Sequence, residues 1–165
     1  MRSPEPAEPG PDQESVWDYP RPPRLERSSS TIEIVLGGIS IVRTDRALRV
    51  LETSHPPTYY VPMSAFLPGS LRPSAGQSFC EWKGTAAYLD VVAGPVVAER
   101  AAWHYPYPTP SFAEVVDHVA VYPAAMAVWW VDDEAVVAQP GGFYGGWVTS
   151  KVVGPFKGEP GTQSW

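Results

Sequence analysis

The sequence predicts a mainly β protein, folded as a compact antiparallel β-rich domain with one short helix. Three observations predict this class. Short apolar or alternating runs recur along the chain, separated by turn residues. The 165 residues include 20 prolines and 14 glycines, which interrupt the chain too often for long helices. No helical segments alternate with the strand-like runs, as a parallel sheet would require.

The N-terminal region predicts two kinds of structure. Residues 1–14 are mostly Pro, Glu and Gly with almost nothing to bury, which predicts a disordered tail. Residues 15–165 are then a single domain that begins with an arm. In this arm Trp17, Tyr19 and Leu25 are spaced along a proline-stiffened segment, so we expect it to lie extended with its aromatic side chains docked.

The first half of the domain predicts four strands and a loop. TIEIVLGGISIVR has two β-type runs around Gly37-Gly38, a hairpin signal because glycine readily takes positive φ. ALRVLE alternates in polarity, and TYYVP is a further strand that ends at Pro62. The segment MSAFLPGSLRPSAGQ contains two prolines and two glycines, which predicts a loop with at most one helical turn.

The second half predicts two more strand pairs and the helix. SFCEWKGTAAYLDVV and PVVAERAAWHY pair across Ala93-Gly94, and MAVWWVDDEAVVAQP turns at Asp132-Asp133. SFAEVVDHV predicts the short helix, with Ser111 as N-cap and Glu114 completing a capping box. A segment rich in glycine and aromatic residues, 141–165, ends the domain.

Composition excludes several classes of function. The formal net charge of −6 disfavours binding to a nucleic-acid backbone, which needs a basic face, and binding to an anionic membrane. Cys80 is the only cysteine, so intramolecular disulfides and cysteine-based zinc sites are excluded. A single thiol, together with an N-terminus that has no apolar signal segment, predicts a cytoplasmic protein. No run approaches the roughly 20 apolar residues of a membrane span.

The stretch VLETSHPPTYYVP combines Glu52, His55 and Tyr60 with two adjacent prolines. The prolines restrict the backbone, so the histidine is presented rigidly. Imidazole titrates near neutral pH, and a histidine beside a glutamate and a tyrosine can serve in general acid–base chemistry. The structural alternative is a corner in which His55 and Glu52 close a turn by hydrogen bonding.

Two other stretches contain candidate binding residues. CEWKGTAAY places Lys83 between Trp82 and Gly84, where a glycine lets a ligand or backbone approach closely. Lys83 then supplies a positive charge among aromatic groups, or is simply a surface lysine at a strand start. AAWHYPYPTPSF has aromatic residues at alternate positions from Trp103, which can wall a ligand cleft or fill the core between two sheets.

Nucleophilic and metal chemistry have less support. Cys80 as a nucleophile would need a base such as His55, whereas a lone cysteine in a strand is usually a small buried apolar residue. The three histidines, His55, His104 and His118, form none of the common metal-binding spacings. We therefore predict no metal site, and the sequence identifies no cofactor.

Several motifs together resemble a known family. They occur in order across about residues 15–165: ESVWDYPRPP, RVLETSHPPTYYVP, CEWKGTAAY, AAWHYPYPTPSF and VDDEAVVAQPGGFYGGWVTSKVVGPFKGEPGTQSW. The chain is similar to the bacterial and fungal family named domain of unknown function 427, also labelled nucleotidyltransferase-9-like. The resemblance implies a β-tent-like domain of two antiparallel sheets. It also implies that these residues recur in its motifs: Glu52, Ser54, His55, Tyr60, Lys83, Gly84, Tyr88 and Trp103.

These observations predict a polar and aromatic pocket that binds a small anionic or aromatic molecule. In this interpretation Lys83 supplies the positive charge, His55 and Tyr60 supply directed hydrogen bonds, and Trp103 supplies a stacking face. Ser54, Gly84 and Tyr88 complete the predicted binding residues. An enzymatic alternative uses His55 as general acid or base, with Glu52 orienting it and Lys83 stabilising negative charge. A third alternative makes the C-terminal segment a protein-interaction surface.

Overall fold

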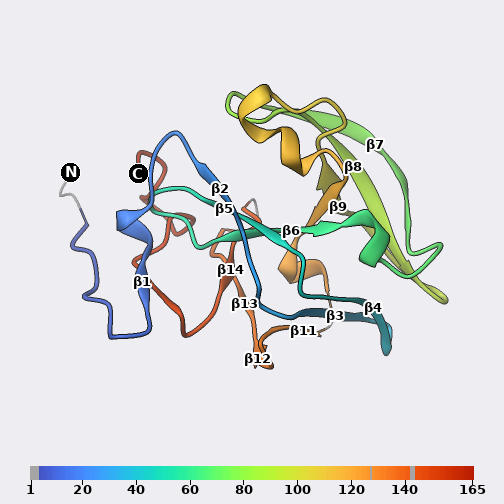
Figure 1. Ribbon diagram of the computed structural model, residues 1–165, viewed down its shortest axis with the longest axis horizontal. Coiled ribbons are helices and arrows are strands. Elements are labelled where there is room, and N and C mark those ends of the chain that lie inside the picture. The colour runs from blue at the N-terminus through green and yellow to red at the C-terminus, as the bar shows by residue number, and fades with distance from the viewer. Residues whose placement is uncertain (1–3, 127, 142–143) are drawn as a thin grey trace.

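The computed structural model describes residues 4–126, 128–141 and 144–165, and over these ranges the protein is mainly β (Figure 1). Two antiparallel sheets dominate the described residues. The larger has seven strands within those ranges, in the spatial order β2 (Arg24–Arg27), β5 (Leu48–Leu51), β6 (Thr58–Pro62), β10 (His118–Val121), β9 (Val96–His104), β8 (Gly84–Ala93) and β7 (Leu71–Cys80).

The smaller sheet packs beside the larger one. Over the described residues it has four strands, in the order β12 (Glu134–Ala135), β11 (Val128–Val131), β3 (Ile32–Leu36) and β4 (Ile39–Thr44). Two short pairs complete the strands: β1 (Glu14–Ser15) with β15 (Val152–Val153), and β13 (Val137–Ala138) with β14 (Trp147–Val148). The helices of the described chain are all short 3-10 turns: η1 (Val16–Asp18), η2 (Met63–Ala65), η3 (Pro110–Val115) and η4 (Pro123–Ala125).

The three predicted hairpins are confirmed. Leu36 pairs with Ile39 across Gly37-Gly38, and both glycines have positive φ, 58° and 76°. Val131 pairs with Glu134 across two aspartates whose φ values, 48° and 66°, are also positive. These two turns match the right-handed twist of their strands, which explains why glycine and aspartate occupy them. β8 and β9 pair where the sequence placed a turn, with Ala93 opposite Val96.

The predicted loop over 63–77 is wrong in its second half. Residues 71–80 form β7, which lies at the edge of the larger sheet and pairs only with β8 in the described structure. The register shifts between Pro73 and Gln77, and Gly76 has a φ of 100°. Proline and an irregular register are tolerated at a sheet edge, because one side of an edge strand makes no ladder hydrogen bonds. The η2 turn agrees with the single helical turn expected there.

The predicted helix is shorter than expected and starts earlier. It is the 3-10 segment η3, its N-cap is Thr109 rather than Ser111, and no side chain caps it. The predicted capping box is therefore wrong. The last two residues of the predicted helix, His118 and Val119, belong instead to β10, which lies between β6 and β9. Pairing on both sides and burial of Val119 outweigh the weak local helical preference.

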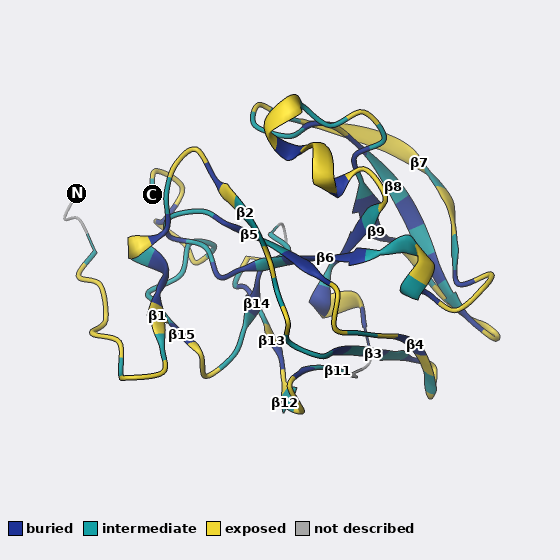
Figure 2. Cartoon of the chain, viewed as in Figure 1, coloured by how far each residue is buried: buried dark blue, intermediate teal, exposed yellow. Residues whose placement is uncertain are grey.

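The larger sheet carries buried side chains on both of its faces. One face packs on the smaller sheet, since the main core cluster draws on both sheets, with Tyr59 and Val61 from β6 and Ile34 from β3. The opposite face carries a second cluster that includes Tyr60 and Trp103. Figure 2 shows buried stretches of chain along β6 and β9, the strands that carry these two residues. Side chains alternate between faces along a strand, so Tyr59 and Tyr60 belong to different clusters.

The N-terminal and C-terminal segments lie side by side at one end of the molecule (Figure 1). The composition predicted that the tail ends and the domain begins after residue 14. Because β1 is Glu14–Ser15, this predicted boundary falls inside a strand. Before it, the Ala7 N–H donates to the Gly154 carbonyl. Residues 1–3 of the predicted tail, and Gly142 and Phe143 of the glycine-rich segment, lie outside the described residues. Across the described ranges, no helix has the length and apolar character needed to cross a bilayer.

Candidate functional site

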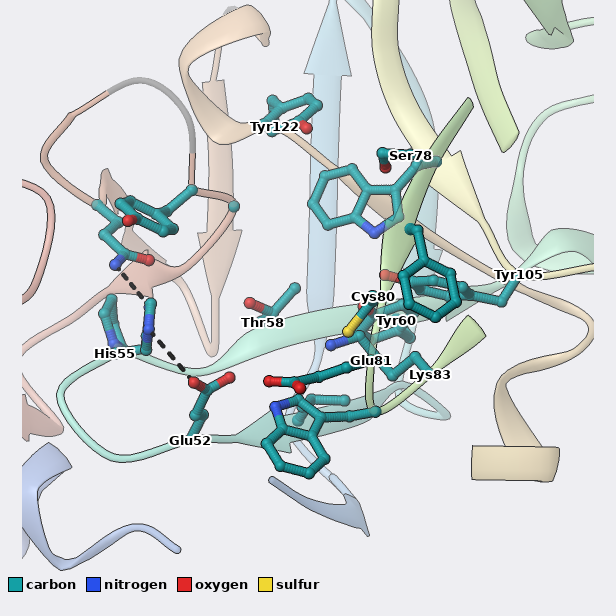
Figure 3. Close-up of a pocket in the computed structure, with 18 of the residues that line it drawn as sticks. Glu52, His55, Thr58, Tyr60, Ser78, Cys80, Glu81, Lys83, Tyr105 and Tyr122 are labelled. Atoms are coloured by element: carbon teal, nitrogen blue, oxygen red, sulfur yellow. Dashed lines mark hydrogen bonds and ion pairs between the residues drawn. The ribbon is translucent and has the colours of Figure 1, made fainter. Parts of the chain in front are cut away.

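A cavity of about 680 Å³ opens on the face of the larger sheet that carries Tyr60 and Trp103 (Figure 3). Its volume falls within the roughly 300–1,000 Å³ of ordinary ligand pockets. Figure 3 shows His55 and Glu52 at one side of the cavity and Lys83 and Tyr105 at the other. The lining combines four sequence regions: Val50, Glu52, His55, Pro56, Thr58, Tyr60; Ser78, Phe79, Cys80, Glu81, Trp82, Lys83, Tyr88; Trp103, Tyr105, Tyr122; and Gln139, Tyr144, Gly145, Lys157.

Aromatic side chains in tilted and edge-on contact form the floor of the cavity. Trp103 on β9 contacts the ring of Tyr122, with centroids 4.5 Å apart, and meets Tyr60 edge-on at 6.4 Å. Tyr60 also contacts Tyr105 at 6.3 Å. Tyr88 lies opposite Trp103 across the β8–β9 pair, so both project from the same face. These contacts are typical of aromatic clusters and hold the rings in fixed positions.

Tyr60, Tyr105 and Tyr122 of the floor remain protonated at neutral pH, because the pKa of each is raised. Burial raises the pKa of Tyr122 to about 12, and neighbouring Tyr88 acts in the same direction. Burial likewise raises the pKa of Tyr60 and of Tyr105 well above the usual value near 10. Each phenol therefore offers a neutral hydroxyl that can donate or accept a hydrogen bond.

Lys83 lies at the turn between β7 and β8, at one side of the aromatic floor. Its Nζ is 5.8 Å from the centroid of Tyr105 and 5.9 Å from that of Phe112, both within cation–π range. The turn is held by Thr109, whose N–H donates to the Lys83 carbonyl and whose hydroxyl donates to the Trp82 carbonyl. Within the described ranges no carboxylate lies at ion-pair distance from this ammonium.

Glu52 and His55 come together through a tight turn. The His55 N–H donates to the Glu52 carbonyl at 3.0 Å, and Ser54, one of the two residues between them, has a φ of 71°. This brings His55 Nε2 to 3.7 Å from Glu52 Oε2. Arg21 also donates to Oε2, from Nε at 3.2 Å and from Nη2 at 3.0 Å. The predicted proximity of Glu52 and His55 is thus present in the structure.

Gln139 contacts the other side of the imidazole. Gln139 is only 3 % exposed, and its Nε2 lies 3.0 Å from His55 Nδ1. The same Nε2 donates to the Lys157 carbonyl, and Oε1 accepts from the Gly146 N–H. The ring of Tyr144 meets the imidazole edge-on, with centroids 5.1 Å apart. His55 is therefore enclosed by Gln139 and by Tyr144 of the C-terminal segment.

All three histidines are expected to destabilise the protein at mildly acidic pH. Burial lowers the pKa of His55, His104 and His118 below the usual value near 6.5. At His55 the carboxylate of Glu52 opposes this effect, whereas Lys157 and Arg21 add to it. Because the unfolded chain then binds more protons than the folded one, the free energy of unfolding should fall as pH drops below about 6.5.

Urea denaturation at pH 7.5 and pH 5.5 measures this fall. We expect His55→Gln to lose less stability between the two pH values than the wild-type protein does. The pKa of Glu14 is lowered by its hydrogen bond with Arg49, and its contribution is lost only below about pH 4.5, outside this window. Equal losses in the variant and the wild type would contradict a buried neutral His55.

Six of the eight predicted site residues line the cavity, and two do not. Ser54 is fully buried, and its carbonyl accepts the Lys157 N–H. Gly84 has a φ of 109°, and a Cβ there would lie 3.1 Å from the Tyr107 carbonyl oxygen. Both residues shape the backbone next to the cavity, where positive φ and close approach favour glycine and tolerate few other residues.

One wall of the cavity was not predicted from the sequence, and Gln139, Tyr144, Gly145 and Lys157 form it. Gln139 was assigned to the predicted strand pair over 126–140, and the other three residues to the segment 141–165, for which no ligand site was predicted. A signal was present in QPGGFYGGW, where Gly145 and Gly146 let the backbone approach other groups closely. A Cβ on Gly145 would lie 2.2 Å from Trp103 Cη2, so only glycine fits against the indole.

Comparison with known proteins adds a family but no activity. The family model described as domain of unknown function (DUF427) matches residues 24–132, more than half of the chain. A search of curated proteins finds no match. In the ranges that the structure describes, no group of three or more His, Cys, Asp or Glu side chains is placed to hold a metal ion.

Proposed function

The chain belongs to the DUF427 family, and we propose that it binds a small ligand with a flat aromatic body and one anionic group in the cavity described above. The convergence of four distant sequence regions on this cavity carries the proposal. Residues 50–60, 78–88, 103–122 and 139–157 have no local reason to meet. Polar and aromatic side chains from each region nevertheless line one cavity.

The chemistry of the lining favours a planar ligand. The rings of Trp103 and its tyrosine neighbours supply flat apolar faces, and the tyrosine hydroxyls supply hydrogen bonds. Lys83 supplies the positive charge for a carboxylate or phosphate group. Two lysines and two glutamates line the cavity, which disfavours a ligand with several negative charges. A monoanionic aromatic acid fits this balance better than a nucleoside triphosphate does.

General-base catalysis by His55 has less support than binding. A general base needs a free nitrogen lone pair within reach of the proton it abstracts. His55 Nδ1 lies against the Gln139 amide, and Nε2 faces Glu52. The third alternative, a C-terminal interaction surface, also has less support. Trp147 is 1 % exposed, and the Trp165 ring contacts Trp17 at 5.2 Å.

The proposed setting is a reducing cytoplasm. Cys80 is the only cysteine of the chain and is a free, half-buried thiol that lines the cavity. Such a thiol is compatible with a compartment that keeps cysteines reduced. The net charge of −6 supports a small-molecule partner rather than nucleic acid or an anionic membrane.

Thermal-shift measurements with two lysine variants test the binding proposal. The panel holds aromatic carboxylates, nucleoside monophosphates and sugar phosphates. An aromatic carboxylate at ~100 times its dissociation constant should stabilise the wild type by about 2.7 kcal/mol. Lys83→Met should abolish the shift, whereas Lys151→Met, at an exposed lysine outside the cavity lining, should keep it. No shift with any aromatic carboxylate, or an unchanged shift in Lys83→Met, would overturn the proposal.

A further inference from the structure

The Gln139 side-chain amide has a fixed orientation. Oε1 accepts a hydrogen bond from the Gly146 N–H at 3.1 Å, and Nε2 donates to the Lys157 carbonyl at 2.8 Å. Both partners are backbone groups, one a donor only and the other an acceptor only. If the amide were rotated by 180°, its NH₂ group would face the Gly146 N–H and its oxygen would face the Lys157 carbonyl oxygen. Both hydrogen bonds would then be lost. Because Gln139 is 3 % exposed, water could not readily replace the lost bonds.

This orientation determines which imidazole nitrogen carries the proton. The second N–H of the Gln139 amide points at His55 Nδ1, 3.0 Å away. Nδ1 must then accept, so neutral His55 carries its proton on Nε2. The charged groups that act on the ring are Glu52, Lys157 and Arg21. Of these, Glu52 lies next to Nε2, at 3.7 Å, where an N–H faces a carboxylate.

The Glu52 carboxylate is left with one open oxygen. Arg21 and His55 both approach Oε2. Over the described residues, no hydrogen bond is made to Oε1. Figure 3 shows this second oxygen directed away from His55 and into the cavity, with the Glu81 carboxylate facing it. This side of the cavity therefore offers hydrogen-bond acceptors, and the Lys83 side offers a cation.

We propose that Gln139 is a positioning residue that holds His55 in the Nε2–H tautomer, and that Glu52 selects the ligand through its open oxygen. The ligand class, which rests on the proposed function, is then an aromatic acid with a hydroxyl or ammonium group at the end opposite its carboxylate. The carboxylate pairs with Lys83, and the hydroxyl or ammonium donates to Glu52. A second carboxylate at that end is rejected by Glu52 and Glu81.

Histidine ¹⁵N NMR of the ligand-free protein tests the role of Gln139. A long-range ¹H–¹⁵N correlation spectrum at pH 7.5 should show that His55 is protonated at Nε2 and unprotonated at Nδ1. The signals of His55 are identified as those that disappear in His55→Gln. Gln139→Glu keeps an acceptor for Gly146 and places a carboxylate at Nδ1, so Nδ1 should become protonated. Gln77→Glu, on exposed β7, should leave the spectrum of His55 unchanged. An Nδ1–H tautomer in the wild-type protein would overturn this role, whether or not the variant folds.

Calorimetric titration with para-substituted benzoates tests the ligand class. 4-Hydroxybenzoate and 4-(aminomethyl)benzoate should bind at least 10-fold more tightly than terephthalate, and Glu52→Gln should reduce that ratio to within about 3-fold. Equal binding of terephthalate to the wild type would overturn the selection by Glu52. Binding by none of these benzoates, with the Nε2–H tautomer present, would overturn the proposed function while the role of Gln139 stands.

Discussion

Replacing Gln139 with leucine is expected to lower the free energy of unfolding by about 2–4 kcal/mol. Leucine has a similar volume but no polar atoms. The Gly146 N–H would lose its acceptor, and the Lys157 carbonyl would lose a donor. Each buried group left without a partner costs about 1–3 kcal/mol. Because Gln139 joins the C-terminal segment to His55, the loss should also loosen one wall of the cavity.

Urea denaturation monitored by tryptophan fluorescence measures this loss. Gln77→Leu is the matched control, because Gln77 is an exposed residue of the edge strand β7. Its effect should stay within about 0.5 kcal/mol. If Gln139→Leu proved as mild as this control, the amide would not be the link between the C-terminal segment and the histidine.

Replacing Gly145 with alanine is expected to destabilise the protein by about 1–3 kcal/mol. The new methyl group would lie 2.2 Å from Trp103 Cη2 and 3.1 Å from its Cζ2 and Cζ3, so one of the two groups must move. Trp103 is 8 % exposed and packed between Tyr60 and Tyr122, so its ring has little freedom to shift. Displacement of the indole should also weaken ligand binding at the floor of the cavity.

A double-mutant cycle separates this clash from a general effect of alanine. Trp103→Phe removes the part of the indole that the methyl group meets. The cost of Gly145→Ala should therefore be smaller by about 1 kcal/mol or more in the Trp103→Phe background. The unfolding midpoints of the four proteins give this coupling. Additive effects would show that Gly145 does not approach Trp103 in solution.

Much of the candidate site could be predicted from sequence, because several of its residues share short motifs. Glu52 and His55 are three residues apart in a proline-restricted stretch, so a tight turn brings them together. The motifs did not distinguish side chains in the cavity from backbone positions beside it. Ser54 and Gly84 lie in the same stretches, but they have positive φ, 71° and 109°, and neither lines the cavity.

The partners of His55 could not be predicted, because they lie far away in sequence. Gln139 is 84 residues from His55 along the chain, and no local pattern indicates that contact. The tautomer of His55 depends on that contact. Its chemical role therefore could not be decided from the proline-rich stretch alone, in which general-base and structural interpretations fit equally well.

The sequence by itself determined the β-rich class and the three hairpins. These depend on local chemistry: alternation along strands, and turns such as Gly37-Gly38 that need positive φ. Only the tertiary structure decided that β7 is a strand, that the predicted helix shortens to η3, and that the C-terminal segment closes the cavity. Each of these depends on pairing or packing with residues distant in the chain, and such contacts outweigh the small local preferences that a sequence pattern records.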